Sequence, residues 1–224
     1  MNFLRMKFES SPEFVRLVPF GIFLVLTYCQ SLEFLGKAAP YWFYLIKTLV
    51  GAWLIWEMRP FVAEMRWAIS SEAIVVGVAV CVLWVGINDF YPKFSKPSDP
   101  SNPHLVFGQD SGAAWFFALV HLLGSTFVVP PLEEVFYRSF VYRYLVKIDF
   151  LSVPLNRFHA MSFAVTAIIF GVVHREWLAG ILCGMAFQWL VIRKNRLGDA
   201  MTAHAITNFL LGLWVIWKGD WKFW

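Results

Sequence analysis

Two adjacent carboxylates and a guanidinium stand inside otherwise apolar sequence, in the stretch PPLEEVFYR of residues 130–138. Burying such charges costs several kcal/mol each unless they are paired, so a membrane protein that keeps them usually uses them. On a helix Glu134 and Arg138 are four residues apart and share a face, which predicts an ion pair. Glu133 points about 100° away from Glu134, which leaves its carboxylate available for chemistry. The alternative is that both glutamates cap a helix N-terminus, where the helix dipole favours anions.

Two histidines and an asparagine are the other chemically useful groups in apolar sequence. His204 and Asn208 are four residues apart and share one helix face, and Phe170 stands one turn before His174 in the same way. A histidine in a membrane helix can also be a packing residue with a hydrogen bond and no ligand. Taken together, an acid pair, two histidines and an amide supply a general base, a proton partner and oxyanion donors, which water attack on an amide requires.

The composition indicates an integral membrane protein. Of 224 residues, 59% are hydrophobic and 15% are charged, against about 25% charged residues in a soluble domain. The net charge of +4 is spread along the chain, so we expect no nucleic-acid partner. Cys29, Cys81 and Cys183 all lie in apolar runs, which favours packing over disulfide formation. The basic N-terminus precedes an apolar run without a small-residue cleavage site, and we interpret that run as a retained span.

Eight apolar runs must position these groups. A membrane core about 30 Å thick needs about 20 apolar residues per helix. The predicted spans are Val15–Leu35, Tyr41–Trp56, Glu72–Asn88, Gly112–Val129, Leu132–Val146, Phe158–His174, Trp177–Ile192 and Leu197–Trp217. They predict an all-α polytopic integral membrane protein with about eight transmembrane helices and both termini on one side. Pro130 and Pro131 are expected to separate the fourth span from the fifth.

One long polar segment interrupts these runs, from Asp89 to Ser111, with four prolines. It cannot cross lipid and is expected to be a solvent loop or to cover a cavity. No repeat and no domain linker is evident. We therefore predict a single membrane domain over residues 1–224, in which 1–111 holds the N-terminal spans and the polar loop and 112–217 holds the catalytic core.

Three motifs now define a resemblance. They resemble, in order and spacing, the motifs of the CPBP family of CAAX-processing and bacteriocin-processing (Abi-type) membrane endopeptidases. The three motifs are Glu133-Glu134-x-x-x-Arg138, Phe170-x-x-x-His174 and His204-x-x-x-Asn208. The resemblance covers roughly Gly112 to Trp217. The aromatic-rich N-terminal half is similar to a CAAX-protease-related bacterial branch associated with exosortase systems.

The resemblance implies an all-helical intramembrane protease of the type II CAAX prenyl endopeptidase kind. Glu133 and His174 would activate a water, and His204 and Asn208 would stabilise the tetrahedral oxyanion. Supporting roles would fall to Glu134, Arg138 and Phe170.

No cofactor is expected, and zinc is the alternative. If a metal is present, its ligands would be Glu133, His174 and His204. The chain has no H-E-x-x-H pairing, and an asparagine is a poor zinc ligand, so water activation by a glutamate without metal is favoured.

The expected partners are the lipid bilayer and a peptide or protein substrate, either lipid-modified or membrane-anchored, in a bacterial inner membrane. A different class remains open: a non-catalytic transporter, binding or immunity protein that uses the same polar cavity, since buried carboxylates and histidines also suit proton relays. A shared site has one geometric requirement. Glu133 begins the fifth predicted helix and His174 ends the sixth, so either both are sunk towards the depth of His204 or the eighth helix begins later than Leu197.

Overall fold

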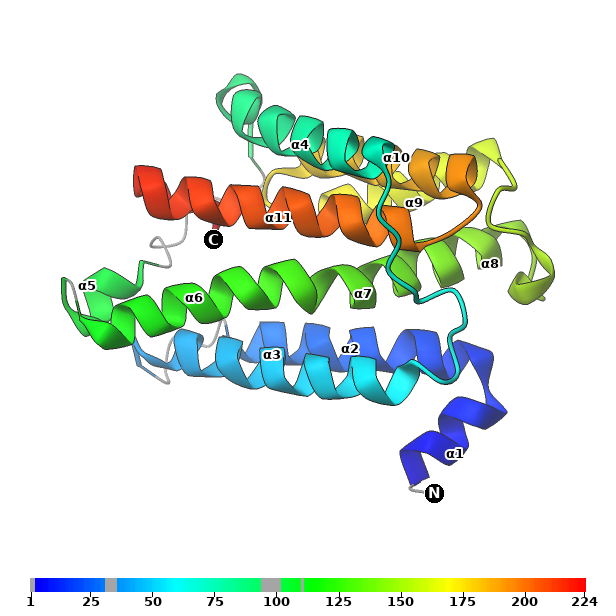
Figure 1. Ribbon diagram of the computed structural model, residues 1–224, viewed down its shortest axis with the longest axis horizontal. Coiled ribbons are helices and arrows are strands. Elements are labelled where there is room, and N and C mark those ends of the chain that lie inside the picture. The colour runs from blue at the N-terminus through cyan, green and yellow to red at the C-terminus, as the bar shows by residue number, and fades with distance from the viewer. Residues whose placement is uncertain (1–2, 31–35, 94–101, 110) are drawn as a thin grey trace.

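The computed structural model of the chain describes residues 3–30, 36–93, 102–109 and 111–224. Helices make up 78% of the structure, and the described residues contain no strand, which confirms the all-α class. Figure 1 shows an elongated bundle whose long helices run roughly along the long axis.

An antiparallel helix pair, α2 (Pro12–Gln30) and α3 (Ala39–Met58), forms one side of the bundle and follows the short α1 (Phe3–Ser10). The end of the first predicted span, residues 31–35, lies outside the described residues. Lys47, in the middle of α3, is buried. Its ammonium donates to the Thr27 hydroxyl (3.3 Å) and stands 4.4 Å from the centre of the Tyr44 ring, so this charge is held inside the protein and away from lipid.

One long helix crosses the middle of the bundle where the sequence predicts two. Its successive segments are α6 (Gly112–Phe127), α7 (Val129–Glu134), the π-helical η3 (Val135–Val141) and α8 (Tyr142–Val146). They form a single helical run of 35 residues. Pro130 and Pro131 fall in the first turn of α7, where a missing N–H costs little. Val128, between α6 and α7, keeps a right-handed helical backbone (φ −102°, ψ −44°), so the predicted break at the prolines is wrong.

The other side of the bundle is formed by α4 (Ser71–Gly86), α9 (Ala160–Val172), α10 (Trp177–Lys194) and α11 (Gly198–Lys218). α9 and α10 form a hairpin so tight that a Cβ on Gly171 would lie 2.6 Å from the backbone nitrogen of Ile181 and 2.7 Å from the carbonyl oxygen of Trp177. The turn between them stops well short of the end that α11 reaches (Figure 1). In that turn Glu176 is buried and His174 is half-buried, whereas Val173 is exposed.

Short elements occupy part of the predicted loop Asp89–Ser111. They are η2 (Asn88–Phe90) and α5 (Pro103–Phe107), which packs against α6; residues 94–101 and 110 of that loop lie outside the described chain. Two more short helices follow, η4 (Phe150–Ser152) and η5 (Trp221–Phe223).

In the described part of the chain, three helical runs are long and apolar enough to cross a membrane, judged by length and composition: Pro12–Gln30, Gly112–Val146 and Gly198–Lys218. Ser71–Gly86 and Ala160–Val172 are shorter apolar helices. These helices support an integral membrane protein, but they do not confirm eight spans. With the fourth and fifth predicted spans merged, the described residues form seven long helical runs. Figure 1 shows α2 beginning at one end of the long axis and α11 finishing towards the other.

Candidate active site

A cavity of about 250 Å³ inside the bundle is lined by all four side chains predicted to be catalytic. Its wall is formed by Tyr44, Trp84, His121, Ser125, Val129, Glu133, Phe170, His174, Glu176, Cys183, His204, Thr207, Asn208, Leu211, Gly212, Phe223 and Trp224. The three motifs therefore meet at one place, although the first and last are separated by about 70 residues of chain.

The depth of Glu133 and His174 follows from the observed helices. Glu133 lies well inside the continuous run Gly112–Val146, whereas a separate fifth span would place it at a helix start. α9 has 13 residues and so is about 20 Å long, which brings His174, just past its end, into the interior of the bundle. Both side chains can therefore reach the cavity that His204 lines from the first half of α11.

Glu134 is fully buried and has two partners. Its Oε2 lies 3.2 Å from Nε of Arg138, four residues on, which is the ion pair expected from the spacing. Its Oε1 is hydrogen-bonded to Nδ1 of His204 at 2.9 Å. Glu134 thus links the helix of the first motif to α11 and sets the orientation of the His204 ring.

Arg138 is fully buried, and Phe170 is its main aromatic neighbour. The guanidinium carbon stands 4.3 Å from the centre of the Phe170 ring, an arrangement in which the ring's negative face attracts the cation. Phe170 thus contacts the charge that pairs with Glu134 and also lines the cavity.

Glu133 differs from Glu134 in its surroundings. Its side chain is 13% exposed, and its Oε2 lies 4.0 Å from Nε2 of His204. That oxygen is buried and accepts no hydrogen bond from the described residues. A buried carboxylate oxygen that faces a cavity without a partner is suited to bind a water or a substrate group.

His174 is held by the backbone of its own helix. Its Nδ1 lies 2.6 Å from the carbonyl oxygen of Phe170, and because a carbonyl only accepts, Nδ1 must carry the hydrogen. The ring of Trp84 packs edge-on against it at 5.5 Å between centroids. In the neutral imidazole, Nε2 therefore keeps a lone pair for a molecule in the cavity.

Asn208 is half-buried and donates from Nδ2 to the carbonyl oxygen of Ser125 at 2.8 Å. An amide group has two N–H donors. The Ser125 contact fixes the carboxamide and leaves one N–H for another acceptor.

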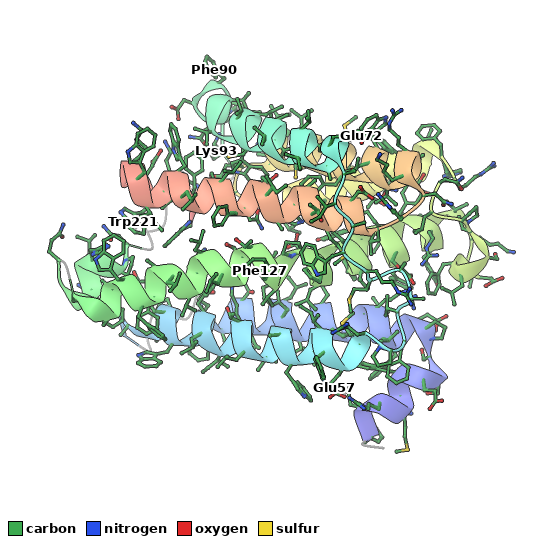
Figure 2. All side chains as sticks on the ribbon, viewed as in Figure 1. Glu57, Glu72, Phe90, Lys93, Phe127 and Trp221 are labelled. Atoms are coloured by element: carbon green, nitrogen blue, oxygen red, sulfur yellow. The ribbon has the colours of Figure 1, made fainter. Side chains whose placement is uncertain are left out.

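Several residues of the wall were not predicted. Glu176 follows His174 by two positions and stands at the start of an apolar helix, where an acid is readily interpreted as a helix cap. His121 is stacked between Tyr44 (ring centroids 4.1 Å apart) and Trp224 (4.2 Å). Trp224 follows η5, whose Trp221 lies towards the end of the molecule at which α11 finishes (Figure 2). These contacts join residues far apart in the chain, so spacing could not have revealed them.

A second ion cluster fastens the helix that carries the acid pair. Glu64, in the turn between α3 and α4, lies 2.7 Å from Nη2 of Arg16 and 2.7 Å from Nη2 of Arg143, and it accepts a hydrogen bond from the Ser139 hydroxyl. Burial alone would raise the pKa of Glu64, but the charge of Arg16 and the hydrogen bonds from Ser139 and Arg16 outweigh it and hold the pKa below its ordinary value. Since Ser139 belongs to η3 and Arg143 to α8, the cluster ties this helix to α2 and to the α3–α4 turn.

The described residues contain no group of three His, Cys, Asp or Glu side chains arranged to hold a metal ion. Glu133, His174 and His204 line one cavity, but they do not form a zinc site in this arrangement. The expectation that no cofactor is needed stays a prediction.

Comparison with known families gives one match. Residues 114–210 match the sequence model of the family described as type II CAAX prenyl endopeptidase Rce1-like. Neither the curated proteins nor the solved structures contain a significant match. The matched segment holds Glu133, His174, His204 and Asn208, and it lies within the range Gly112–Trp217 over which the motifs resemble CPBP proteases. Residues 114–210 of this chain are therefore similar to the Rce1-like family of type II CAAX prenyl endopeptidases.

Proposed function

We propose that this protein is an intramembrane endopeptidase that hydrolyses a peptide bond with a water activated by Glu133 and His174. The observation that carries the proposal is that Glu133, His174, His204 and Asn208, from separate segments of the chain, line one cavity inside a bundle of apolar helices. The match to a family of CAAX endopeptidases supports the same class of reaction.

Water activation uses the two groups that have free acceptor capacity. Oε2 of Glu133 accepts no hydrogen bond from the described residues, and Nε2 of His174 has a lone pair when Nδ1 donates to Phe170. In the proposed reaction the Glu133 carboxylate takes a proton from the water while His174 orients it. The water oxygen then bonds to the carbonyl carbon of the substrate.

The resulting tetrahedral intermediate has a negative charge on the former carbonyl oxygen. Asn208 can donate its second N–H to that oxygen, because its first N–H is held by Ser125. His204 donates from Nε2 when both ring nitrogens carry a proton, which the proposed role requires because Nδ1 is bonded to Glu134. Each such donor typically accelerates the reaction about 10²–10³-fold.

Collapse of the intermediate completes the reaction. The carbon–nitrogen bond breaks, and the proton held by Glu133 passes to the departing amine nitrogen. The products are a new carboxyl terminus and a new amino terminus, and Glu133 returns to its carboxylate form. No step requires a metal.

The substrate would be a peptide or protein that is membrane-anchored or lipid-modified, such as a prenylated CAAX protein, and the setting a bacterial inner membrane. The exosortase-associated branch is a further prediction from the aromatic-rich N-terminal half.

A proton relay is the second candidate function, because three titratable groups stand in sequence. Glu133 lies 4.0 Å from His204, which lies 2.9 Å from Glu134. Beyond Glu134 the described contacts lead to Arg138, which is fully buried beside Phe170. A guanidinium does not release its proton in proteins, so these contacts end inside the bundle, and a peptidase is favoured.

The test separates the two candidates. Protein in lipid nanodiscs is incubated with prenylated and unprenylated CAAX peptides and with a peptide library, and products are identified by mass spectrometry. We expect complementary fragments from wild type and from Glu9→Gln, a change at an exposed position, and none from Glu133→Ala. A lack of fragments from every peptide, together with Glu133-dependent proton flux in liposomes, would replace the peptidase by a relay.

A further inference from the structure

Glu176 is a buried carboxylate in the wall of the cavity that the proposed reaction does not use. Its side chain is 9% exposed. Its Oε1 is buried and accepts no hydrogen bond from the described residues. Burying a carboxylate oxygen without a hydrogen bond costs free energy, because its bonds to water are lost and not replaced. A binding partner that is absent from the structure would explain why this oxygen is buried.

Two structural roles could explain Glu176: a helix cap, which the contacts do not fit, and an ion pair with Arg175, which leaves Oε1 without a hydrogen bond. It occupies the N-cap position of α10, yet its side chain makes no capping hydrogen bond. Its Oε1 lies 3.8 Å from Nη1 of Arg175, beyond hydrogen-bonding distance, and that nitrogen donates instead to the carbonyl oxygen of Lys222 at 3.3 Å.

The nearby ammonium of Lys93 is also engaged elsewhere. Its charge is close enough to interact with that of Glu176, but it donates to the backbone carbonyl of Asn88 and stands 3.2 Å from the centre of the Tyr91 ring. Figure 2 shows Lys93 beyond the end of α4. The loop that contains Lys93 is joined to α10 by a hydrogen bond from the indole N–H of Trp177 to the carbonyl oxygen of Pro92. Lys93 therefore does not neutralise the Glu176 carboxylate by direct contact.

The charge of the cavity points to the missing partner. Among the described residues, its lining includes two carboxylates, Glu133 and Glu176, and no lysine or arginine; Arg175, which is not part of the lining, lies 3.8 Å from Glu176. Carboxylates in a low-dielectric cleft focus a negative potential and attract cations. Trp84 and Phe223 line the same wall, and aromatic faces also attract cationic groups.

We propose that Glu176 binds a positively charged group of the substrate, a lysine or arginine side chain close to the scissile bond. This inference rests on the proposed peptidase function and deepens it, because it names the residue class that the cavity selects. Glu176 is two residues from His174, so the bound cation would lie beside the water that His174 orients. Glu176 is thus a specificity residue, separate from the groups that act on the peptide bond.

The test compares matched peptides that carry lysine or the uncharged norleucine at each position around the cleavage site. For wild type and the Glu9→Gln control we expect kcat/KM to favour lysine by about tenfold or more at one position, as for a hydrogen bond to a charged group. In Glu176→Gln that preference should disappear, so that the ratio of kcat/KM for the lysine peptide to that for the norleucine peptide falls to about one. A wild type without a lysine preference at any position, or a preference that persists in Glu176→Gln, would overturn the proposal.

Two further measurements separate this inference from the peptidase mechanism. In Glu133→Gln, which should not cleave, lysine peptides should bind more tightly than norleucine peptides, and Glu133→Gln/Glu176→Gln should lose that difference. If wild type cleaves none of the peptides and Glu133→Gln still binds lysine peptides more tightly, the peptidase is contradicted and the cation site is kept. Equal binding of both peptides to Glu133→Gln would contradict the cation site. If Glu176 served only to pair with Arg175, Arg175→Gln and Glu176→Gln would lower thermal stability alike and neither would change the lysine preference.

Discussion

His204 has a carboxylate on each side, and the two contacts differ. Glu134 bonds to its Nδ1 at 2.9 Å and is fully buried, whereas Glu133 lies 4.0 Å from Nε2 and faces the cavity. A ring held at one nitrogen presents the other in a fixed direction. Two adjacent residues of one helix thus have different surroundings: Glu134 orients His204, and Glu133 faces the cavity.

Asn208 gives the sharpest residue-scale prediction, because a carboxamide cannot titrate and so adds nothing to a proton relay. Asn208→Ala should lower kcat of peptide cleavage by about 10²–10³ with KM little changed. Asn208→Asp should be at least as damaging, because a carboxylate repels the developing oxyanion. The measurement is steady-state cleavage of a fluorogenic peptide by variants of matched thermal stability.

The control for this series is Asn156→Ala at an exposed position, which should behave as wild type. Wild-type kcat in both Asn208 variants would remove Asn208 from the mechanism.

Part of the site could be predicted at this scale. The spacing of four predicts the Glu134–Arg138 pair, because such residues share a helix face. The bond from Glu134 to His204 joins residues about 70 apart, and no local pattern contains it. Glu176 was missed for a related reason: only its lack of a capping bond and its place in the cavity wall distinguish it from a helix cap.

At the scale of elements, the α9–α10 hairpin sets the position of His174. A Cβ at Gly171 would meet backbone atoms of α10 at 2.6 and 2.7 Å, and backbone cannot move aside as a flexible side chain does. Gly171→Ala should therefore push α9 from α10, cost about 1–3 kcal/mol of stability and lower peptide turnover through His174.

The matched control is Gly21→Ala in α2, where a Cβ would meet nothing within 4 Å. It should be neutral or stabilising by about 0.5–1 kcal/mol. Thermal unfolding of the two variants in nanodiscs measures the difference, and equal melting temperatures would contradict the close-packing explanation.

The Glu64 cluster predicts how acid affects the long helix. The pKa of Glu64 is lowered in the fold from an unfolded value of about 4.3. Its contribution to stability is therefore fully present above pH about 4.3 and is lost as pH falls through the lower folded pKa. Wild-type Tm should drop over that acid range more than that of Glu64→Gln, which should already be less stable at neutral pH. Glu9→Gln should keep the wild-type slope, and parallel curves for Glu64→Gln and wild type would refute a Glu64 contribution.

The helix positions were largely predictable, because long apolar runs mark helices whatever their partners. The junction at Pro130 and Pro131 was not. Proline disfavours a helix interior, yet it fits a first turn, and Val128 keeps a helical backbone before it. Whether such a junction bends, breaks or continues depends on what packs around it, including the Glu64 contacts to η3 and α8.

At the scale of the whole molecule, the merged helix changes the expected topology. Seven long runs in the described chain alternate in direction, so the start of α1 and the end of α11 should lie on opposite sides of a membrane that all seven cross. Met6→Cys and Lys218→Cys, made in separate variants, introduce a cysteine at exposed positions near the two ends of the chain. In intact cells treated with a membrane-impermeant maleimide, we expect only one of the two introduced cysteines to be labelled before lysis. Wild type, whose Cys81 and Cys183 are buried, gives the background. Labelling of both introduced cysteines, or of neither, before lysis would indicate an even number of membrane crossings and contradict the seven-helix topology.

The central claim is that the cavity hydrolyses peptide bonds with Glu133 as base, and the most direct test is the kcat of Glu133→Gln. The amide matches the carboxylate in shape but cannot take a proton from water. At a thermal stability equal to that of wild type, we predict that cleavage falls to the rate without enzyme. Turnover by a folded Glu133→Gln protein within a few-fold of wild type would contradict the claim.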